Sequence, residues 1–126
     1  MRHVWIVDDD QEMSKAMRMM LELLDCHTTS FLSARSAAQT LLTGERPDMM
    51  VLDINMPEVS GLDLLEFLRR RSEWQDLPVV MLSSEAADVT VDEAMGLGAD
   101  GYVMKPVTLE ELEKVIEVAF KKHQKG

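Results

Sequence analysis

Apolar residues along this chain form two kinds of pattern. Three short runs, at residues 4–7, 49–52 and 79–82, are continuous rather than alternating. Continuous runs of this length are typical of parallel strands that are covered on both faces. Two weaker strands are predicted over residues 26–32 and 100–104.

The segments between these runs have apolar residues at helical spacing. One predicted helix follows Ser33 and ends at Gly44, another covers residues 88–97, and the last begins at the capping-box residues Thr108 and Glu111. Strand and helix therefore alternate throughout. Right-handed crossovers then give an α/β fold, an open parallel sheet with helices on both faces.

Composition fits one globular domain, and charge restricts its partners. The 126 residues carry a net charge of −10, which repels nucleic acid and anionic lipid, so we expect no direct contact with nucleic acid or membrane. The single cysteine, Cys26, excludes an internal disulfide. The chain shows no signal peptide or membrane-spanning run, and we expect a cytoplasmic protein. The three histidines lack the spacing of metal ligands and are interpreted as structural or surface residues.

Polar residues follow the predicted strands at the points where those strands end. Asp8 and Asp9 follow the first strand, Asp53 ends the third, Ser83 follows the fourth and Lys105 follows the fifth. Because functional groups of such sheets gather at the carboxyl ends of the strands, we expect these side chains to lie close together.

This combination of residues points to phosphoryl transfer. Three converging carboxylates repel one another, and a hard divalent cation, Mg²⁺ or alternatively Mn²⁺, would offset that repulsion. Lys105 supplies a fixed positive charge for a phosphoryl group, and the Ser83 hydroxyl can donate a hydrogen bond to it. The nucleophile is then the Asp53 carboxylate, which would form an aspartyl phosphate.

Each motif taken alone has a simpler interpretation. Asp10 is expected to serve only as the N-cap of the first helix. Asp8 and Asp9 could form a solvated turn, and Lys105 with Pro106 could form another. The occurrence of all these groups at one edge of the sheet is what favours a site.

Four motifs carry a resemblance to a known family. They are Val7-Asp8-Asp9, Leu52-Asp53-Ile54-Asn55-Met56-Pro57, Gly61, and Gly98-Ala99-Asp100-Gly101-Tyr102-Val103-Met104-Lys105-Pro106. Together they resemble the receiver domains of bacterial response regulators, especially the single-domain chemotaxis type. The resemblance implies a receiver domain over residues 1–122, with 123–126 a frayed tail. It also implies a flavodoxin-like (βα)5 sandwich with strand order 2-1-3-4-5.

The resemblance also implies roles for the site residues. Asp53 corresponds to the phosphoacceptor, which receives its phosphoryl group from a sensor histidine kinase, a histidine phosphotransfer protein or a small acyl phosphate. Asp8 and Asp9 correspond to the acidic pair that binds Mg²⁺ together with Asp53 and the backbone carbonyl of Asn55. Lys105 corresponds to the lysine that contacts the phosphoryl group, and its bond to the following proline is expected to be cis.

A second set of implied roles concerns the response. Ser83 and Tyr102 correspond to a switch pair in which the aromatic ring turns inward. Asn55 and Glu85 lie two residues beyond Asp53 and Ser83, and we expect them to set the lifetime of the phosphate. The output would pass through the face of the fourth helix, fifth strand and fifth helix, to an unknown target or effector domain, in a monomer or a phosphorylation-dependent dimer. The fourth helix, with Gly96, Thr90 and Val91, is predicted to be weakly held.

Three alternatives remain at this point. The chain could be the receiver module of a longer transcription regulator. A flavin-binding module would share the architecture, although the acidic residues after the first strand would repel a phosphate. A phosphatase of the haloacid-dehalogenase type also forms an aspartyl phosphate, but here Asn55 replaces its second acid. On the preferred interpretation, the protein is a switch that catalyses only its own phosphorylation and dephosphorylation.

Overall fold

The fold is built on one parallel sheet. A computed structural model describes residues 1–84 and 88–123, with only the backbone described for 88–90. The five strands lie side by side in the order β2-β1-β3-β4-β5. They are β1 (Arg2–Val7), β2 (Cys26–Phe31), β3 (Met49–Asp53), β4 (Val79–Ser83) and β5 (Gly101–Met104). The predicted architecture and strand order are confirmed.

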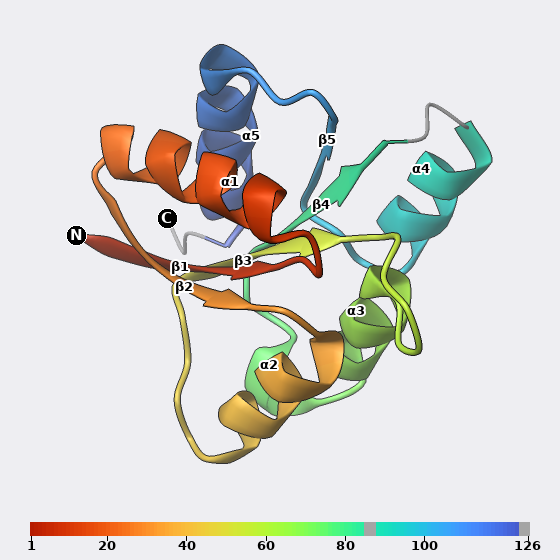
Figure 1. The fold of residues 1–126 in the computed structure, drawn as a ribbon. Helices are drawn as coiled ribbons and strands as arrows, with labels where there is room; N and C mark the ends of the chain where they lie inside the picture. The colour runs from red at the N-terminus through yellow and green to blue at the C-terminus, as the bar shows by residue number, and fades with distance from the viewer. Residues whose placement is uncertain (85–87, 124–126) are drawn as a thin grey trace.

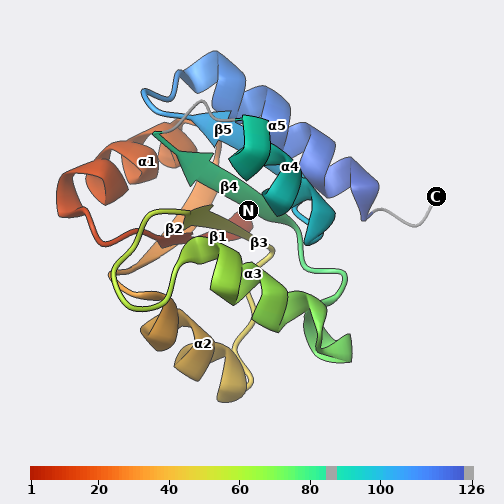
Figure 2. The same cartoon turned by 90° about the vertical axis from the view of Figure 1, so that its right-hand side faces the viewer.

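Helices cover both faces of this sheet (Figure 1). They are α1 (Gln11–Leu23), α2 (Ala34–Leu42), α3 (Gly61–Arg69), α4 (Asp88–Gly96), α5 (Leu109–Lys122) and a short 3-10 helix, η1 (Ser72–Trp74). The buried residues of α1 and α5 pack in one core cluster, and those of α2, α3 and α4 pack in the other. Figure 2 shows α1 and α5 above the strands and α2 and α3 below them. None of the described helices has the length and apolar character that a membrane crossing requires.

The burial of each strand explains its sequence. Every residue of β3 and β4 is buried, as expected for central strands with a helix layer on each face. The edge strand β2 has a single buried residue, Cys26. This difference accounts for the strong apolar runs in the centre and the weak pattern at the edge.

Side-chain caps define where the helices begin. Asp10 accepts hydrogen bonds from the backbone N–H groups of Glu12 and Met13, which confirms it as the N-cap of α1. The capping box predicted at Thr108 is only half formed. The Thr108 hydroxyl accepts a hydrogen bond from the Glu111 N–H, but within the described residues the Thr108 N–H does not donate to the Glu111 side chain. Glu111 instead lines a groove beside β5. A complete capping box opens α3.

Candidate functional site

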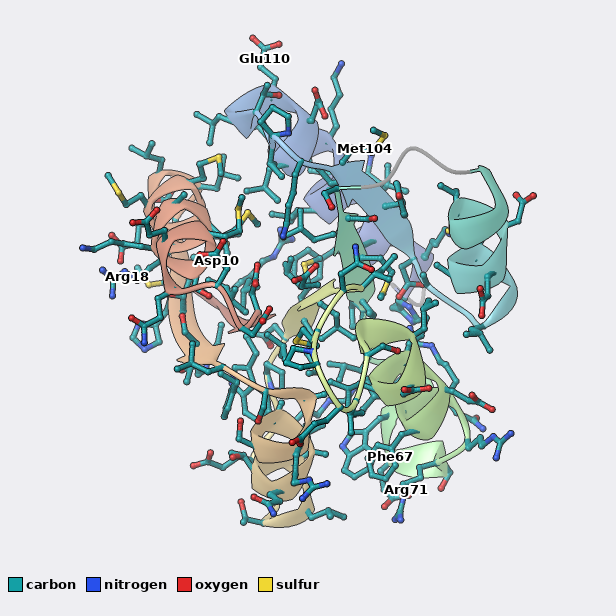
Figure 3. All side chains as sticks on the ribbon, turned by 45° about the vertical axis from the view of Figure 1, so that its right-hand side comes forward. Asp10, Arg18, Phe67, Arg71, Met104 and Glu110 are labelled. Atoms are coloured by element: carbon teal, nitrogen blue, oxygen red, sulfur yellow. The ribbon has the colours of Figure 1, made fainter. Side chains whose placement is uncertain are left out.

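The ends of four strands bring the candidate residues together. Strand pairing places Asp53 beside Leu82 and Ser83 beside Met104, and the Lys105 N–H continues the ladder by donating to the Ser83 carbonyl at 2.8 Å. Figure 3 shows Asp10 at the start of α1 and Met104 at the end of β5, on either side of this edge. The edge is therefore the carboxyl end that the sequence predicts.

Asp8 is the most constrained of these residues. Its side chain is fully buried, and its Oδ1 accepts a hydrogen bond from the Asp10 N–H at 2.9 Å. Its Oδ2 has no hydrogen-bond partner, the sole buried side-chain oxygen or nitrogen in this condition among the described residues. Buried polar atoms are rarely left in this state unless a water or ion satisfies them.

Asp9 and Asp53 complete an acidic group with Asp8. One carboxylate oxygen from each of the three lies within 4.8 Å of the others. Asp53 is only 3% exposed and accepts a hydrogen bond from the Asn55 N–H at 3.2 Å, whereas Asp9 is exposed. The group is thus closed toward the core and open toward solvent at Asp9.

Lys105 supplies the positive charge at this site. Its Nζ lies 3.5 Å from Asp53 Oδ1 and 3.7 Å from Asp8 Oδ2, with 19% of the side chain exposed. The Lys105–Pro106 peptide bond is cis, as the family resemblance implies. Lys105 therefore contacts the candidate nucleophile and the carboxylate with the unsatisfied oxygen at the same time.

The electrostatics of Asp8 reflect this crowding. Burial, together with the negative charge of Asp53, raises the pKa of the Asp8 carboxyl to about 6, against the lowering effects of the Asp10 N–H and Lys105. A buried carboxylate with a raised pKa next to a like charge is a common feature of functional sites. One ammonium does not offset three carboxylates.

A hard cation fits this arrangement. Mg²⁺ takes oxygen ligands and is usually held by one or two carboxylates together with water and phosphate oxygens. Asp8, Asp9 and Asp53 offer such oxygens, and the orphaned Oδ2 of Asp8 is an oxygen that an ion would satisfy. The donor set contains no sulfur or imidazole, which argues against a softer metal.

Two supporting residues had no role assigned from the sequence. A Cβ atom at Gly61 would lie 2.2 Å from the Asp53 carbonyl oxygen, so only glycine lets the start of α3 pack against the end of β3. The buried Ser14 hydroxyl donates to the Asp8 carbonyl at 3.4 Å. In the sequence, Ser14 could have been noticed as a polar residue on the apolar face of the first helix.

The predicted switch residues lie on the β4 and β5 side of the site. Ser83 is completely buried, and Tyr102 is half-buried. Tyr102 also lines a shallow groove of about 470 Å³ between β5 and α5, with Val118 and Lys114. Glu85, predicted to influence phosphate lifetime, lies outside the described residues, as does the side chain of Thr90 in α4.

A second buried charge cluster lies at the opposite end of the sheet. Asp100 Oδ2 accepts from Arg69 and from the Val79 N–H, both at 2.9 Å, and Asp100 Oδ1 lies 2.8 Å from His123 Nε2. Burial lowers the pKa of Arg69, and the charge of Asp100 opposes that effect. His123, expected from the sequence to lie in a frayed tail, is instead the C-cap of α5, and residues 124–126 lie outside the described chain.

Comparison with known proteins agrees with this geometry. The family model of the response regulator receiver domain matches residues 4–117. The chain is 34% identical over 119 residues to the chemotaxis protein CheY of Pseudomonas aeruginosa, covering 94% of this chain and 96% of that protein.

Longer proteins match as well. The chain is 37% identical to the protein RcaC of Microchaete diplosiphon, covering 86% of this chain but 17% of RcaC. It is 30% identical to the KDP operon transcriptional regulatory protein KdpE of Escherichia coli, covering 98% of this chain and 53% of KdpE. Among solved structures, the Vibrio cholerae chemotaxis protein CheY4 superposes with a TM-score of 0.83 at 26% identity, over 93% of this chain and 97% of that one.

Proposed function

The chain belongs to the response regulator receiver domain family, and from this we propose that it is switched by transfer of a phosphoryl group to Asp53. Receiver domains of this family are signalling switches of two-component systems rather than enzymes in the usual sense. The observation that carries the proposal is the convergence of Asp8, Asp9 and Asp53 with Lys105 at the carboxyl end of the sheet. The proposed receiver domain covers residues 1–122.

The reaction we propose is an in-line displacement at phosphorus. A carboxylate oxygen of Asp53 attacks, the bond from phosphorus to the donor's nitrogen or oxygen breaks, and its electron pair leaves with the donor. The donor is a phosphohistidine on a sensor histidine kinase or phosphotransfer protein, or a small acyl phosphate. Lys105, already 3.5 Å from Asp53, stabilises the negative charge of the transferred group.

The acidic residues prepare this reaction. Asp8, Asp9, Asp53 and the backbone carbonyl of Asn55 would hold Mg²⁺, or Mn²⁺ in its place, and the ion would neutralise charge on the phosphoryl oxygens. The Asp10 N–H fixes Oδ1 of Asp8, so that Oδ2 faces the site. Without an ion, the charges of these carboxylates would repel an incoming phosphate.

The response to phosphorylation is proposed to pass through Ser83 and Tyr102. A new phosphoryl oxygen offers an acceptor for the Ser83 hydroxyl, and movement of Ser83 would leave room for the half-buried Tyr102 ring to turn inward. Tyr102 lines the groove between β5 and α5. The face of α4, β5 and α5 is therefore the surface that would change for an output partner or a second copy.

The lifetime of the phosphate is proposed to depend on two flanking positions. The Asn55 side chain is exposed at the mouth of the site, two residues after Asp53, and Glu85 lies two residues after Ser83. Replacing either residue is expected to change the rate of hydrolysis more than the rate of phosphorylation. Equal changes in the two rates would contradict this assignment.

A longer context is a second candidate. The match covers about half of KdpE, a transcriptional regulatory protein, which favours the same chemistry working inside a longer regulator. The proposed reaction at Asp53 is identical in both contexts, but the output differs. A stand-alone switch changes its affinity for a separate target on phosphorylation, whereas a module of a longer protein acts on its own effector domain.

Acetyl phosphate tests the phosphoacceptor directly. The protein is incubated with acetyl phosphate and Mg²⁺, and its intact mass is measured for wild type, Asp53→Asn and the exposed-site control Asp92→Asn. We expect one phosphoryl group on wild type and on the control, none on Asp53→Asn, and none on wild type when a chelator removes the metal. Phosphorylation of Asp53→Asn to the wild-type level would overturn the assignment.

A further inference from the structure

Two histidines that are far apart in the sequence meet at the amino end of the sheet. His3 in β1 and His27 in β2 are register partners, and their ring centroids lie 4.9 Å apart with the planes tilted by 53°. His27 is exposed and His3 is half-buried. His3 and Asp8 are five positions apart along the chain, or about 17 Å at about 3.3 Å per residue, so this pair is separate from the acidic site.

The spacing of the two rings matches that of two imidazoles on one metal ion. A metal–nitrogen distance of about 2.0 Å, and a further distance of about 1.1 Å from nitrogen to ring centre, place two such rings about 5 Å apart on a tetrahedral ion. The measured 4.9 Å is close to this value. The tilted planes also differ from parallel stacking.

A neighbouring hydroxyl prepares His3 as a ligand. His3 Nε2 lies 2.7 Å from Thr29 Oγ1. Metal-binding histidines usually donate their second ring N–H to a nearby oxygen, which fixes the tautomer. With Nε2–H donating to Thr29, Nδ1 of His3 carries the lone pair. The His27 ring contacts His3 but makes no hydrogen bond within the described part of the chain, so its nitrogens are available.

We propose that His3 and His27 form a two-histidine site for a borderline divalent metal ion, represented here by Zn²⁺. Water would complete the coordination. Among the side chains that the structure describes, residues 1–84 and 91–123, the acidic group at the other end is the only set of three potential metal ligands, so no third protein ligand joins the two histidines. The Asp48 carboxylate accepts a hydrogen bond from the backbone N–H of His3 at 2.7 Å and adds negative charge nearby. Cys26 is excluded as a ligand because its side chain is buried in the core cluster that contains the buried residues of α1 and α5.

Ligand chemistry separates the two sites. Imidazole favours Zn²⁺, Cu²⁺ and Ni²⁺, whereas carboxylates and carbonyls favour Mg²⁺. The ion bound by the histidines would link the edge strand β2 to β1, where β2 has few buried side chains to hold it. Zinc should therefore raise the thermal midpoint of the protein in the presence of Mg²⁺.

Zinc titration by calorimetry in millimolar Mg²⁺ tests the site. Wild type should bind one Zn²⁺ through the pair, and His27→Gln should bind it at least tenfold more weakly. Thr29→Val should weaken binding less, because it removes only the group that orients His3. His123→Gln is the matched control, since this third histidine contacts Asp100 instead, and it should bind as wild type does.

Two results would overturn the proposal. They are the absence of zinc binding at tens of micromolar and unchanged binding by His27→Gln; in the second case, loss of binding in Asp8→Asn would place the zinc at the acidic site instead. Because His27 is exposed, its replacement should leave the fold intact, and unchanged unfolding in chelator checks this.

Discussion

The two ends of the sheet each bury a carboxylate beside a cation, yet they differ in how completely those charges are satisfied. At the amino end, both oxygens of Asp100 have partners at 2.8–2.9 Å, from Arg69, His123 and a backbone N–H. At the carboxyl end, Asp8 Oδ2 accepts no hydrogen bond from any residue that the structure describes, and Lys105 Nζ stays 3.5–3.7 Å from the two carboxylates it faces.

This difference separates a structural cluster from a reactive one. Arg69 also donates to the carbonyls of Gly98 and Trp74, so it ties α3, η1 and the turn before β5 together. The acidic site does not tie elements of the fold together in this way. It holds like charges close to one another. A site whose carboxylates lack a full set of hydrogen-bond and charge partners among the described residues is suited to bind an ion and a phosphoryl group.

Removing the cation at the amino end should have the largest effect. Arg69→Met would leave Asp100 buried without its main partner, and we expect a loss of about 3–5 kcal/mol in the free energy of unfolding. Urea denaturation measures this change. Arg71→Met is the matched control: the Arg71 guanidinium is exposed and lies 4.8 Å above the Phe67 ring (Figure 3), and its loss should cost about 0.5 kcal/mol or less. Equal losses would contradict the comparison.

Neutralising a carboxylate at the other end should have the opposite sign. The pKa of Asp8 rises from 3.8 to about 6 on folding, so its charge destabilises the metal-free protein at pH 7 by up to about 3 kcal/mol. Asp8→Asn should therefore stabilise the protein in chelator and abolish Mg²⁺ binding. Asn retains an oxygen for the Asp10 N–H. Urea denaturation in chelator measures the change, and a less stable variant would contradict the expected sign.

The same effect should appear as a pH dependence. Between about pH 4 and pH 6 the folded protein holds a proton on Asp8 that the unfolded chain releases, so stability in chelator should fall as pH rises through this window. Asp8→Asn should remove this slope. A wild-type profile that rises with pH across the window, or an unchanged slope in the variant, would show that Asp8 is not the titrating group.

Magnesium affinity should depend on the same proton. At pH 5 only about one Asp8 in ten is ionised if its pKa is about 6, so Mg²⁺ should bind about tenfold more weakly than at pH 7.5. Calorimetric titration at the two pH values measures the ratio. Equal affinities would contradict the raised pKa.

The smallest expected effect belongs to His123. Its bond to Asp100 is one of several on that carboxylate, and 21% of its side chain is exposed, so His123→Gln should cost about 1 kcal/mol. His27→Gln in chelator is the control, because its ring makes no hydrogen bond within the described residues. A loss as large as that of Arg69→Met would mean that His123 rather than Arg69 holds the cluster.

Much of the fold could be predicted because the central strands are covered on both faces. Continuous apolar runs as short as those of β3 and β4 are typical of buried parallel strands, and the polar residues that follow them must meet at one edge. The acidic site was predictable for that reason. The capping box of α3 was missed because Asp63, rather than the usual Glu or Gln, completes it.

The second charge cluster could not be predicted because its contacts are long-range. In the sequence, Arg69, Arg70 and Arg71 form a uniform basic run at a helix end. In the structure only Arg69 turns inward, to a carboxylate 31 residues away. The pairing of His3 with His27 likewise depends on the register of β1 and β2, which sequence spacing does not indicate.

Location of the phosphoryl group tests the central claim most directly. After reaction with acetyl phosphate and Mg²⁺, borohydride reduces an aspartyl phosphate to homoserine, and peptide mass spectrometry locates the modified residue. We predict homoserine at position 53 alone, in wild type and in His27→Gln. Homoserine at Asp8, Asp9 or Asp100 with an unmodified Asp53 would contradict the account.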